Sequence, residues 1–339
     1  MRDDLLTIVI PTRDRPDLLA LCLRSVFEDQ SSVPPVIVSD NSTRDHAAIQ
    51  TLQRRYRFAY VRQSGGLSAA EHLNVCLRMP TSRWVLQLHD DDELCSATLG
   101  TLQEFLADGP PVGIVMAGTQ TIDQEGRVLR QWVPPRRATL RGDEALLALG
   151  LDWGLRAPGT IYGVQESERL GGFPNVLGMA ADYTHATALA YTFGIAFHPE
   201  LVGRQREGHQ RETAFDTPAK AHRWLSFVCQ QAALVRTLGG SPEVADRLVD
   251  YLAWTIFEAL EPSWRHFDRT VVLELVQTCL RYSPKPGTAQ NRVRRTHPFL
   301  FWRPRWLPEP ALGLGRLALR SLPRPIRRAL RTAVARLLQ

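Results

Sequence analysis

Short apolar runs recur along the first third of the chain without alternating with polar residues. They lie at residues 7–10, 36–38, 84–88 and 112–116. Continuous apolar runs of this kind are typical of strands that are buried on both faces, as in a parallel sheet. The pattern therefore predicts a central, mostly parallel sheet.

Between these runs the spacing becomes helical. Apolar residues recur every three to four positions within residues 15–30. A second helix is expected to begin at Ser68, because Ser68 and Glu71 form the S-x-x-E pattern of a capping box. The alternation of strand and helix predicts an α/β fold over residues 1–216.

The chain changes character after about residue 217. Three long stretches with helical spacing follow, separated by Gly-Gly-Ser-Pro and Pro-Ser breaks. We therefore expect a helical region over residues 217–285. Residues 286–339 form an Arg- and Pro-rich tail whose last part has the pattern of an amphipathic helix.

The composition narrows the class of protein. Of 339 residues, 44% are apolar, which is ample for a core. No apolar run reaches the roughly 18 residues of a membrane span. The N-terminus, with two early acids and a proline after its apolar run, does not resemble a signal peptide. Five scattered cysteines without paired spacing indicate reduced thiols. These features predict a cytoplasmic protein.

The net charge of +6 is concentrated in the tail. Residues 292–339 hold 12 arginines and one acid, so they carry +11 and leave the rest of the chain at −5. A basic amphipathic helix indicates peripheral contact with the inner face of a membrane. Docking of this helix on its own domain or on a partner subunit remains an open alternative. Because the rest of the chain is acidic, we expect no nucleic-acid partner. The oligomeric state is not predicted.

Polar residues follow the predicted strands. Ligands of open α/β sheets bind beyond the carboxyl ends of the strands, and three exits are polar, at residues 11–16, 39–43 and 89–93. We expect the fourth run to end in a Gly/Thr turn near Ala117. Turn propensity alone is an open explanation for the exit at residues 39–43.

The exit at residues 89–93 reads His-Asp-Asp-Asp-Glu. Neighbouring carboxylates at about 4 Å repel by on the order of 1 kcal/mol in water, so a cation is expected there. Oxygen ligands on a loop suit Mg²⁺ or Mn²⁺ shared with a substrate's phosphates. The chain has neither of the common glycine-rich phosphate loops. A nucleotide would therefore be held by base and ribose contacts and by the metal.

Four stretches in this order resemble family-2 glycosyltransferases of the GT-A fold. They are residues 7–26, 36–43, 65–94 and 171–190. The resemblance implies a GT-A type nucleotide-binding sandwich followed by the helical region. It also implies a nucleotide-sugar donor, with a UDP-sugar as the first choice and GDP or dTDP as alternatives. The acceptor would be a glycan, a lipid-linked glycan or another hydroxyl compound.

The resemblance also implies roles for single residues. Asp40 would accept a hydrogen bond from the base and Asp90 would meet the ribose. The metal would be held by Asp91, with Asp92 as the alternative register, because His89 stands where relatives have the first acid. Further candidates near the metal and diphosphate are Arg204 and His209, the latter with an ordinary loop histidine as the alternative. The implied donor contacts are Pro11, Thr12, Arg13, Asp40, Asn74 and Asp90.

An inverting transferase needs a base that deprotonates the acceptor hydroxyl. The family commonly uses the Asp of a Glu-Asp pair at a helix start after Gly-Gly-Phe. This chain has Ala181-Asp182 there, which leaves Asp182 as the candidate catalytic base. A helix N-cap is the open alternative for Asp182.

Two other functions compete with a metal-dependent inverting glycosyltransferase. A sugar nucleotidyltransferase would need a glycine-rich basic loop after the first strand, and residues 11–16 contain no glycine. The other is a non-catalytic protein that binds nucleic acid or membrane through the tail.

Overall fold

The computed structural model describes six segments of the chain, namely residues 5–44, 47–134, 138–149, 155–174, 180–207 and 217–260. The chain falls into two compact units. The first comprises residues 1–214 and 230–248, and the second comprises residues 215–229 and 249–339. The predicted domain boundaries near 216 and 285 remain predictions.

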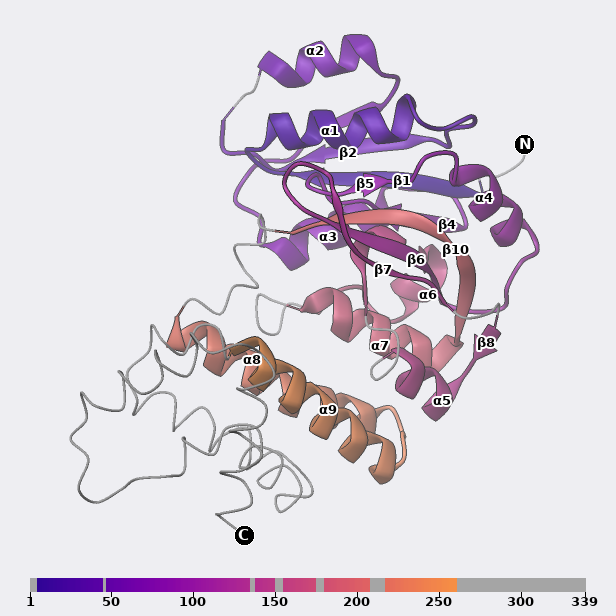
Figure 1. The fold of residues 1–339 in the computed structure, drawn as a ribbon, viewed down its shortest axis with the longest axis vertical. Helices are drawn as coiled ribbons and strands as arrows, with labels where there is room; N and C mark the ends of the chain where they lie inside the picture. Colours follow the sequence, from indigo (N-terminus) through magenta and orange to yellow (C-terminus); the bar gives the residue numbers. More distant parts are fainter. Residues whose placement is uncertain are drawn as a thin grey trace, which may run out of the picture. The chain divides into compact units, whose positions relative to one another are not determined.

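The first unit is built on one mixed sheet (Figure 1), whose main strand order is β3-β2-β1-β4-β9-β6-β10-β5. Its strands are β1 Leu6–Thr12, β2 Val36–Asp40, β3 Ala59–Arg62, β4 Trp84–Gln87, β5 Glu93–Leu94, β6 Ile114–Ile122, β7 Val128–Trp132, β8 Ala138–Leu140, β9 Thr160–Gly163 and β10 Ile195–Arg206. Within the described residues, β1, β2, β3, β4, β6 and β10 run in one direction. The predicted mostly parallel central sheet is therefore confirmed.

Helices cover both faces of this sheet (Figure 1). They are α1 Pro16–Phe27, α2 Ala47–Arg55, α3 Ala69–Arg78, α4 Leu99–Ala107, α5 Gly142–Leu147, α6 Val164–Arg169 and α7 Ala181–Phe193, with a short 3₁₀ turn at Ala157–Gly159. One apolar core packs α1, α2 and α4 against the sheet, and a second core packs α3, α5, α6 and α7 against the opposite face. The strand residues between them are buried on both sides, which explains their unbroken apolar runs.

Two helix starts follow the sequence signals. Ser68 caps α3: its side chain accepts the Glu71 N–H at 3.3 Å, and the Glu71 carboxylate accepts the Ser68 N–H at 2.8 Å. The predicted capping box is therefore confirmed. Pro16 occupies the first turn of α1, where its missing N–H has no intrahelical partner to lose.

The prediction that a strand ends in a turn near Ala117 is wrong. Strand β6 continues through Gly118 to Ile122. A Cβ atom on Gly118 would lie 2.8 Å from the Glu200 carbonyl oxygen on the neighbouring strand. This glycine therefore marks a close approach of two backbones at a bulge in β10, and not the end of a strand.

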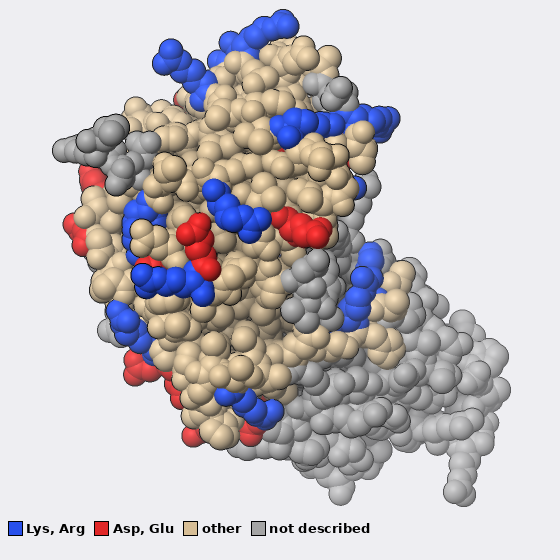
Figure 2. All heavy atoms as spheres, turned by 180° about the vertical axis from the view of Figure 1, so that it is seen from behind, with Lys and Arg blue, Asp and Glu red and all other residues tan. Residues whose placement is uncertain are grey.

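The chain after residue 217 is helical as far as it is described, in α8 Pro218–Thr237 and α9 Pro242–Leu260. The third predicted helix and the basic tail lie outside the described residues. None of the described helices is both long and apolar enough to span a membrane. On the face shown in Figure 2, basic side chains of the described residues are scattered, and some of them lie beside acidic ones.

Candidate active site

Three strand exits meet in one pocket of about 750 Å³. Its walls come from residues 11–18, which run from the end of β1 into α1, from Asn41 after β2 and from residues 89–91 after β4. His72 and Leu73 of α3 close another side. The pocket thus lies beyond the carboxyl ends of parallel strands, where the fold class places ligands.

Pro11, Thr12 and Arg13 line this pocket, as do Asp90 and Asp91. The Thr12 hydroxyl donates to Asp90 Oδ2 at 2.8 Å across the ends of β1 and β4. Burial raises the pKa of Asp90 to about 6; the charge of Asp91 adds to the rise, while Arg15 and Thr12 oppose it. A buried carboxylate held at the pocket wall is thus available to a polar ligand.

The raised pKa of Asp90 predicts a change in stability. Because the folded-state pKa exceeds the unfolded value, ionised Asp90 destabilises the fold above about pH 6, and this penalty shrinks as the pH falls toward 4. In EDTA, Asp90→Asn should raise the free energy of unfolding by on the order of 2 kcal/mol at pH 7.5 and by less at pH 5. Denaturant unfolding at both pH values measures this, with the exposed Asp29→Asn as control. An equal effect at both pH values would contradict it.

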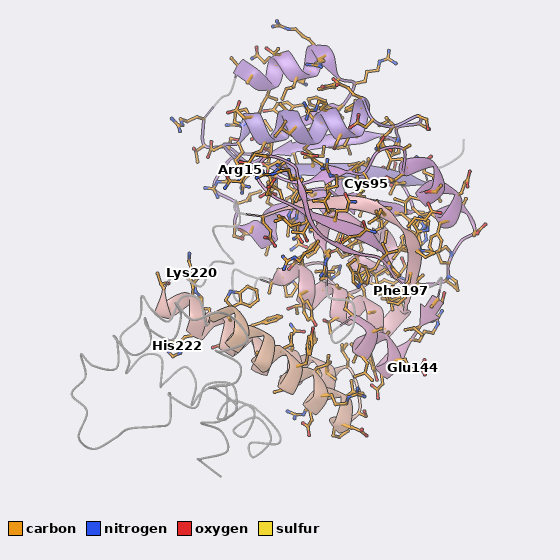
Figure 3. The ribbon with its side chains drawn as sticks, viewed as in Figure 1. Arg15, Cys95, Glu144, Phe197, Lys220 and His222 are labelled. Carbon is orange, nitrogen blue, oxygen red and sulfur yellow. The ribbon has the colours of Figure 1, made fainter. Side chains whose placement is uncertain are left out.

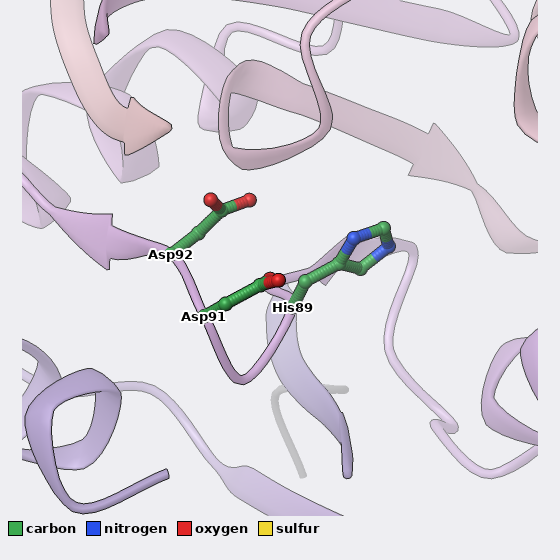
Figure 4. Close-up of side chains that lie close together, drawn as sticks. All are labelled: His89, Asp91 and Asp92. Atoms are coloured by element: carbon green, nitrogen blue, oxygen red, sulfur yellow. The ribbon is translucent and has the colours of Figure 1, made fainter. Parts of the chain in front are cut away.

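His89, Asp91 and Asp92 form a cluster (Figure 4). One potential ligand atom from each lies within 4.8 Å of the others. Two carboxylates and an imidazole match the donor preferences of Mn²⁺, and the carboxylates suit Mg²⁺. Burial raises the pKa of Asp92 well above its usual value, and the charge of Asp91 adds to this. A divalent ion would relieve that repulsion, so these residues fit the metal that the sequence predicts.

Arginines compensate the rest of the acidic run. Arg15, which immediately precedes α1 (Figure 3), donates to Asp91 Oδ2 at 2.8 Å and lies 3.4 Å from Asp90 Oδ1. The backbone N–H of Arg206 donates to Asp92 Oδ1 at 3.0 Å. The sequence interpretation missed both arginines, although Arg15 stands in the first polar exit. Arg206 carries no local signal, because it lies 114 residues from Asp92.

The structure does not bring Arg204 to the pocket. Its guanidinium donates to Glu93 Oε2 at 2.7 Å and to the Gly126 carbonyl at 2.6 Å. Arg206 pairs with the same Glu93 carboxylate. Arg204 therefore neutralises the last acid of the run instead of facing the lining residues. His209 lies outside the described residues.

Arg15 binds the Asp91 carboxylate, which a metal ion would also bind. Since an exposed ion pair contributes up to about 1 kcal/mol, Arg15→Gln should raise the affinity for Mn²⁺ without nucleotide by about two- to fivefold. Arg13→Gln removes the same charge from the same pocket but no contact with Asp91, so it should raise the affinity less. Calorimetric Mn²⁺ titrations compare the two variants. Equal effects would show that only the net charge matters.

Asp40 is fully buried and is not in the lining. It accepts hydrogen bonds from the Tyr60 hydroxyl at 2.7 Å, from Arg62 at 2.6 Å and from the Ser42 N–H at 2.8 Å. Burial alone would raise the pKa of Asp40, but these hydrogen bonds outweigh it and the pKa is lowered. Asn41, the next residue, lines the pocket instead. A direct contact of Asp40 with the base remains a prediction.

Asn74 and Asp182 also lie outside the pocket lining. Asn74 makes a two-way pair with the Phe173 backbone, donating from Nδ2 to its carbonyl and accepting its N–H at Oδ1, both at 2.7 Å. Asp182 is half-buried in the first turn of α7, where it accepts the Tyr183 N–H at 2.8 Å. The N-cap of α7 is Ala180, so Asp182 is not the cap. The role of Asp182 as base is untested by this geometry.

Comparison with known proteins identifies the relatives of this chain. The model of the family described as "Glycosyl transferase family 2" matches residues 7–156. The curated relative "Uncharacterized protein MT1568" from Mycobacterium tuberculosis is 30% identical over 114 residues, which cover 33% of this chain and 35% of the relative. The match thus spans about a third of that protein's length.

Solved structures share the fold over most of the chain. Residues 1–349 of S. aureus TarS superpose with a TM-score of 0.59 at 14% identity, covering 86% of this chain and 85% of TarS. The mannosyltransferase PcManGT from Pyrobaculum calidifontis gives 0.55 at 17% identity, covering 99% and 86%. The GT-A type sandwich predicted from the sequence is therefore confirmed.

Proposed function

We propose that this chain is a metal-dependent, inverting glycosyltransferase, because the model of glycosyl transferase family 2 matches its residues 7–156. It would move a sugar from a nucleoside diphosphate donor to a hydroxyl of a glycan or lipid-linked glycan. The observation that carries the proposal is the meeting of Thr12, Asp90 and Asp91 at one pocket of about 750 Å³. Such a volume is in the range of small-molecule sites.

Solved relatives support a nucleotide-sugar donor. TarS was crystallised with UDP-GlcNAc, and PcManGT with GDP-Man and Mn²⁺. We retain a UDP-sugar as the first choice for this chain. Asp90, oriented by the Thr12 hydroxyl, would accept a hydrogen bond from the ribose. Arg13, exposed on the pocket wall, would pair with the diphosphate.

His89, Asp91 and Asp92 would hold Mg²⁺ or Mn²⁺. A divalent ion bound there would supply positive charge to the diphosphate as the glycosidic bond breaks. The backbone N–H of Arg206 holds Asp92 by a hydrogen bond, and Arg15 holds Asp91. A cation bound at the cluster would take the place of Arg15 on Asp91.

Asp182 would act as the base. It takes the proton of the acceptor hydroxyl while that oxygen bonds to the anomeric carbon of the donor sugar. The bond from this carbon to the diphosphate oxygen breaks, and its electron pair leaves on the diphosphate. Attack from the opposite face inverts the configuration.

A nucleotide screen tests the proposal. Thermal shifts with UDP, GDP, dTDP and CMP, each with and without Mn²⁺, should reveal one metal-dependent diphosphate ligand. The matching nucleotide sugar should then give slow release of the nucleoside diphosphate. Binding of none of them under any metal condition would refute it. Pyrophosphate release from a nucleoside triphosphate would instead support a nucleotidyltransferase.

Membrane contact through residues 286–339 is proposed from the sequence alone. A tail-deleted chain should lose its binding to anionic liposomes. Salt-sensitive binding of the tail to random DNA would support the nucleic-acid alternative.

A further inference from the structure

Asn74 lies between the two halves of the proposed reaction site. It belongs to α3, whose residues His72 and Leu73 line the donor pocket. Its own amide is turned to the Phe173 backbone, which satisfies the Asn74 Nδ2 donor and Oδ1 acceptor at 2.7 Å each. The Asn74 amide thus donates to and accepts from the Phe173 backbone, as a neighbouring β-strand would, although the two residues are 99 apart in the sequence.

The backbone at residue 172 lies close against the Asn74 side chain. Gly172 has a φ of +78°, and a Cβ atom there would collide with Asn74 Oδ1. The Phe173 ring is buried and packs against His185 of α7 at 4.6 Å between ring centroids. Residues 172–173 are therefore fastened to α3 on one side and to α7 on the other.

The same helix is tied to β4, the strand that precedes the acidic run. Gln87, at the end of β4, donates to the Leu73 carbonyl at 3.0 Å. Contacts therefore lead from β4 to α3, from Asn74 to Phe173, and from Phe173 to His185. His185 lies three residues after Asp182, so the two side chains are neighbours on one helix face. The path joins the donor side to the candidate base.

We infer that Asn74 is a positioning residue for transfer and not a donor contact. It fixes the loop at residues 172–173, and through His185 it sets where the first turn of α7 presents Asp182. The inference rests on the proposed function, because it assigns Asp182 to the acceptor. Misplacing a reacting group by about 1 Å can cost on the order of 100-fold in rate.

Kinetics of Asn74→Ala test this inference, with Asn74→Asp as a second variant that keeps the acceptor for the Phe173 N–H but loses the donor. Arg78→Ala, an exposed change on the same helix, is the control. We expect kcat for transfer to fall by about 10- to 100-fold in Asn74→Ala, with the nucleotide Kd and donor KM within about twofold. Amide exchange at Phe173 should become faster, and Asn74→Asp should also lower kcat, because its carboxylate oxygen would face the Phe173 carbonyl to which Asn74 Nδ2 donates.

Two results would overturn the inference. If nucleotide affinity falls in parallel with kcat, Asn74 contacts the donor. If Phe173 exchanges faster while kcat is unchanged, the pair has no part in transfer. A wild-type chain that binds nucleotide but transfers no sugar would instead refute the proposed function, and this differs from a defect that is confined to the Asn74 variants.

Discussion

Asp182→Asn is expected to lower the kcat of sugar transfer by about 100- to 10,000-fold, because removing a general base typically costs this much. The donor pocket should be unaffected, since Asp182 lies outside its lining. Asparagine has nearly the same shape and can still accept the Tyr183 N–H that Asp182 accepts at 2.8 Å. Nucleotide affinity and thermal stability should therefore stay close to those of the wild type.

Single-turnover transfer and calorimetric nucleotide binding together measure this effect. Glu168→Gln removes an exposed carboxylate on α6 and serves as the control. A variant that retains full transfer would exclude Asp182 as base. A variant that loses nucleotide binding would place Asp182 at the donor instead.

Two residues with strained backbone conformations lie near the proposed site, one in the donor pocket and one directly before the helix that carries the candidate base. Asp14, in the pocket wall, and Ala180, directly before α7, have φ values of +55° and +54°. Such conformations cost non-glycine residues on the order of 1 kcal/mol or more, so surrounding contacts must hold them. The Asp14 N–H donates to Ser42 Oγ at 2.7 Å, and the Ala180 carbonyl accepts the Thr184 N–H at 3.1 Å. Strain held in this way is common at functional sites.

The sequence predicted those elements whose formation depends mainly on residues close together in the chain. The apolar runs at β1, β2 and β4 are buried on both faces, and the Ser68 capping box is made within four residues. The acidic run after β4 was recognisable because like charges do not gather without a compensating cation. Its meeting with the exit of β1 follows from the parallel pairing of these two strands.

Long-range contacts account for what the sequence did not predict. The antiparallel strand β9 lies between β4 and β6. Its short sequence does not indicate which strands it pairs with. The resemblance implies a donor contact for Asn74, and no local pattern reveals its partner at Phe173. It also implies a diphosphate contact for Arg204, whose partner Glu93 is 111 residues away. Such pairings depend on the register of the whole sheet.

Asp91→Ala is expected to abolish metal-dependent nucleotide binding. With nucleotide and Mn²⁺ at one hundred times Kd, a bound ligand stabilises the wild type by about 2.7 kcal/mol. Asp91 is the carboxylate of the cluster that also lines the pocket, so its removal takes away the ligand shared between metal and donor. Thermal shift with and without Mn²⁺ should show the wild-type increase and no increase in the variant. Asp29→Ala is the control, because Asp29 is exposed and outside the lining.

Asp92→Asn then distinguishes the two registers of the metal motif. Asp92 is 3% exposed and already accepts the Arg206 N–H at 3.0 Å, and it does not line the pocket. Its substitution should therefore weaken the metal-dependent shift less than Asp91→Ala does. If Asp91→Ala keeps its shift while Asp92→Asn loses it, the metal contact lies one residue further along the chain, and Arg15 pairs with a carboxylate that the metal does not use.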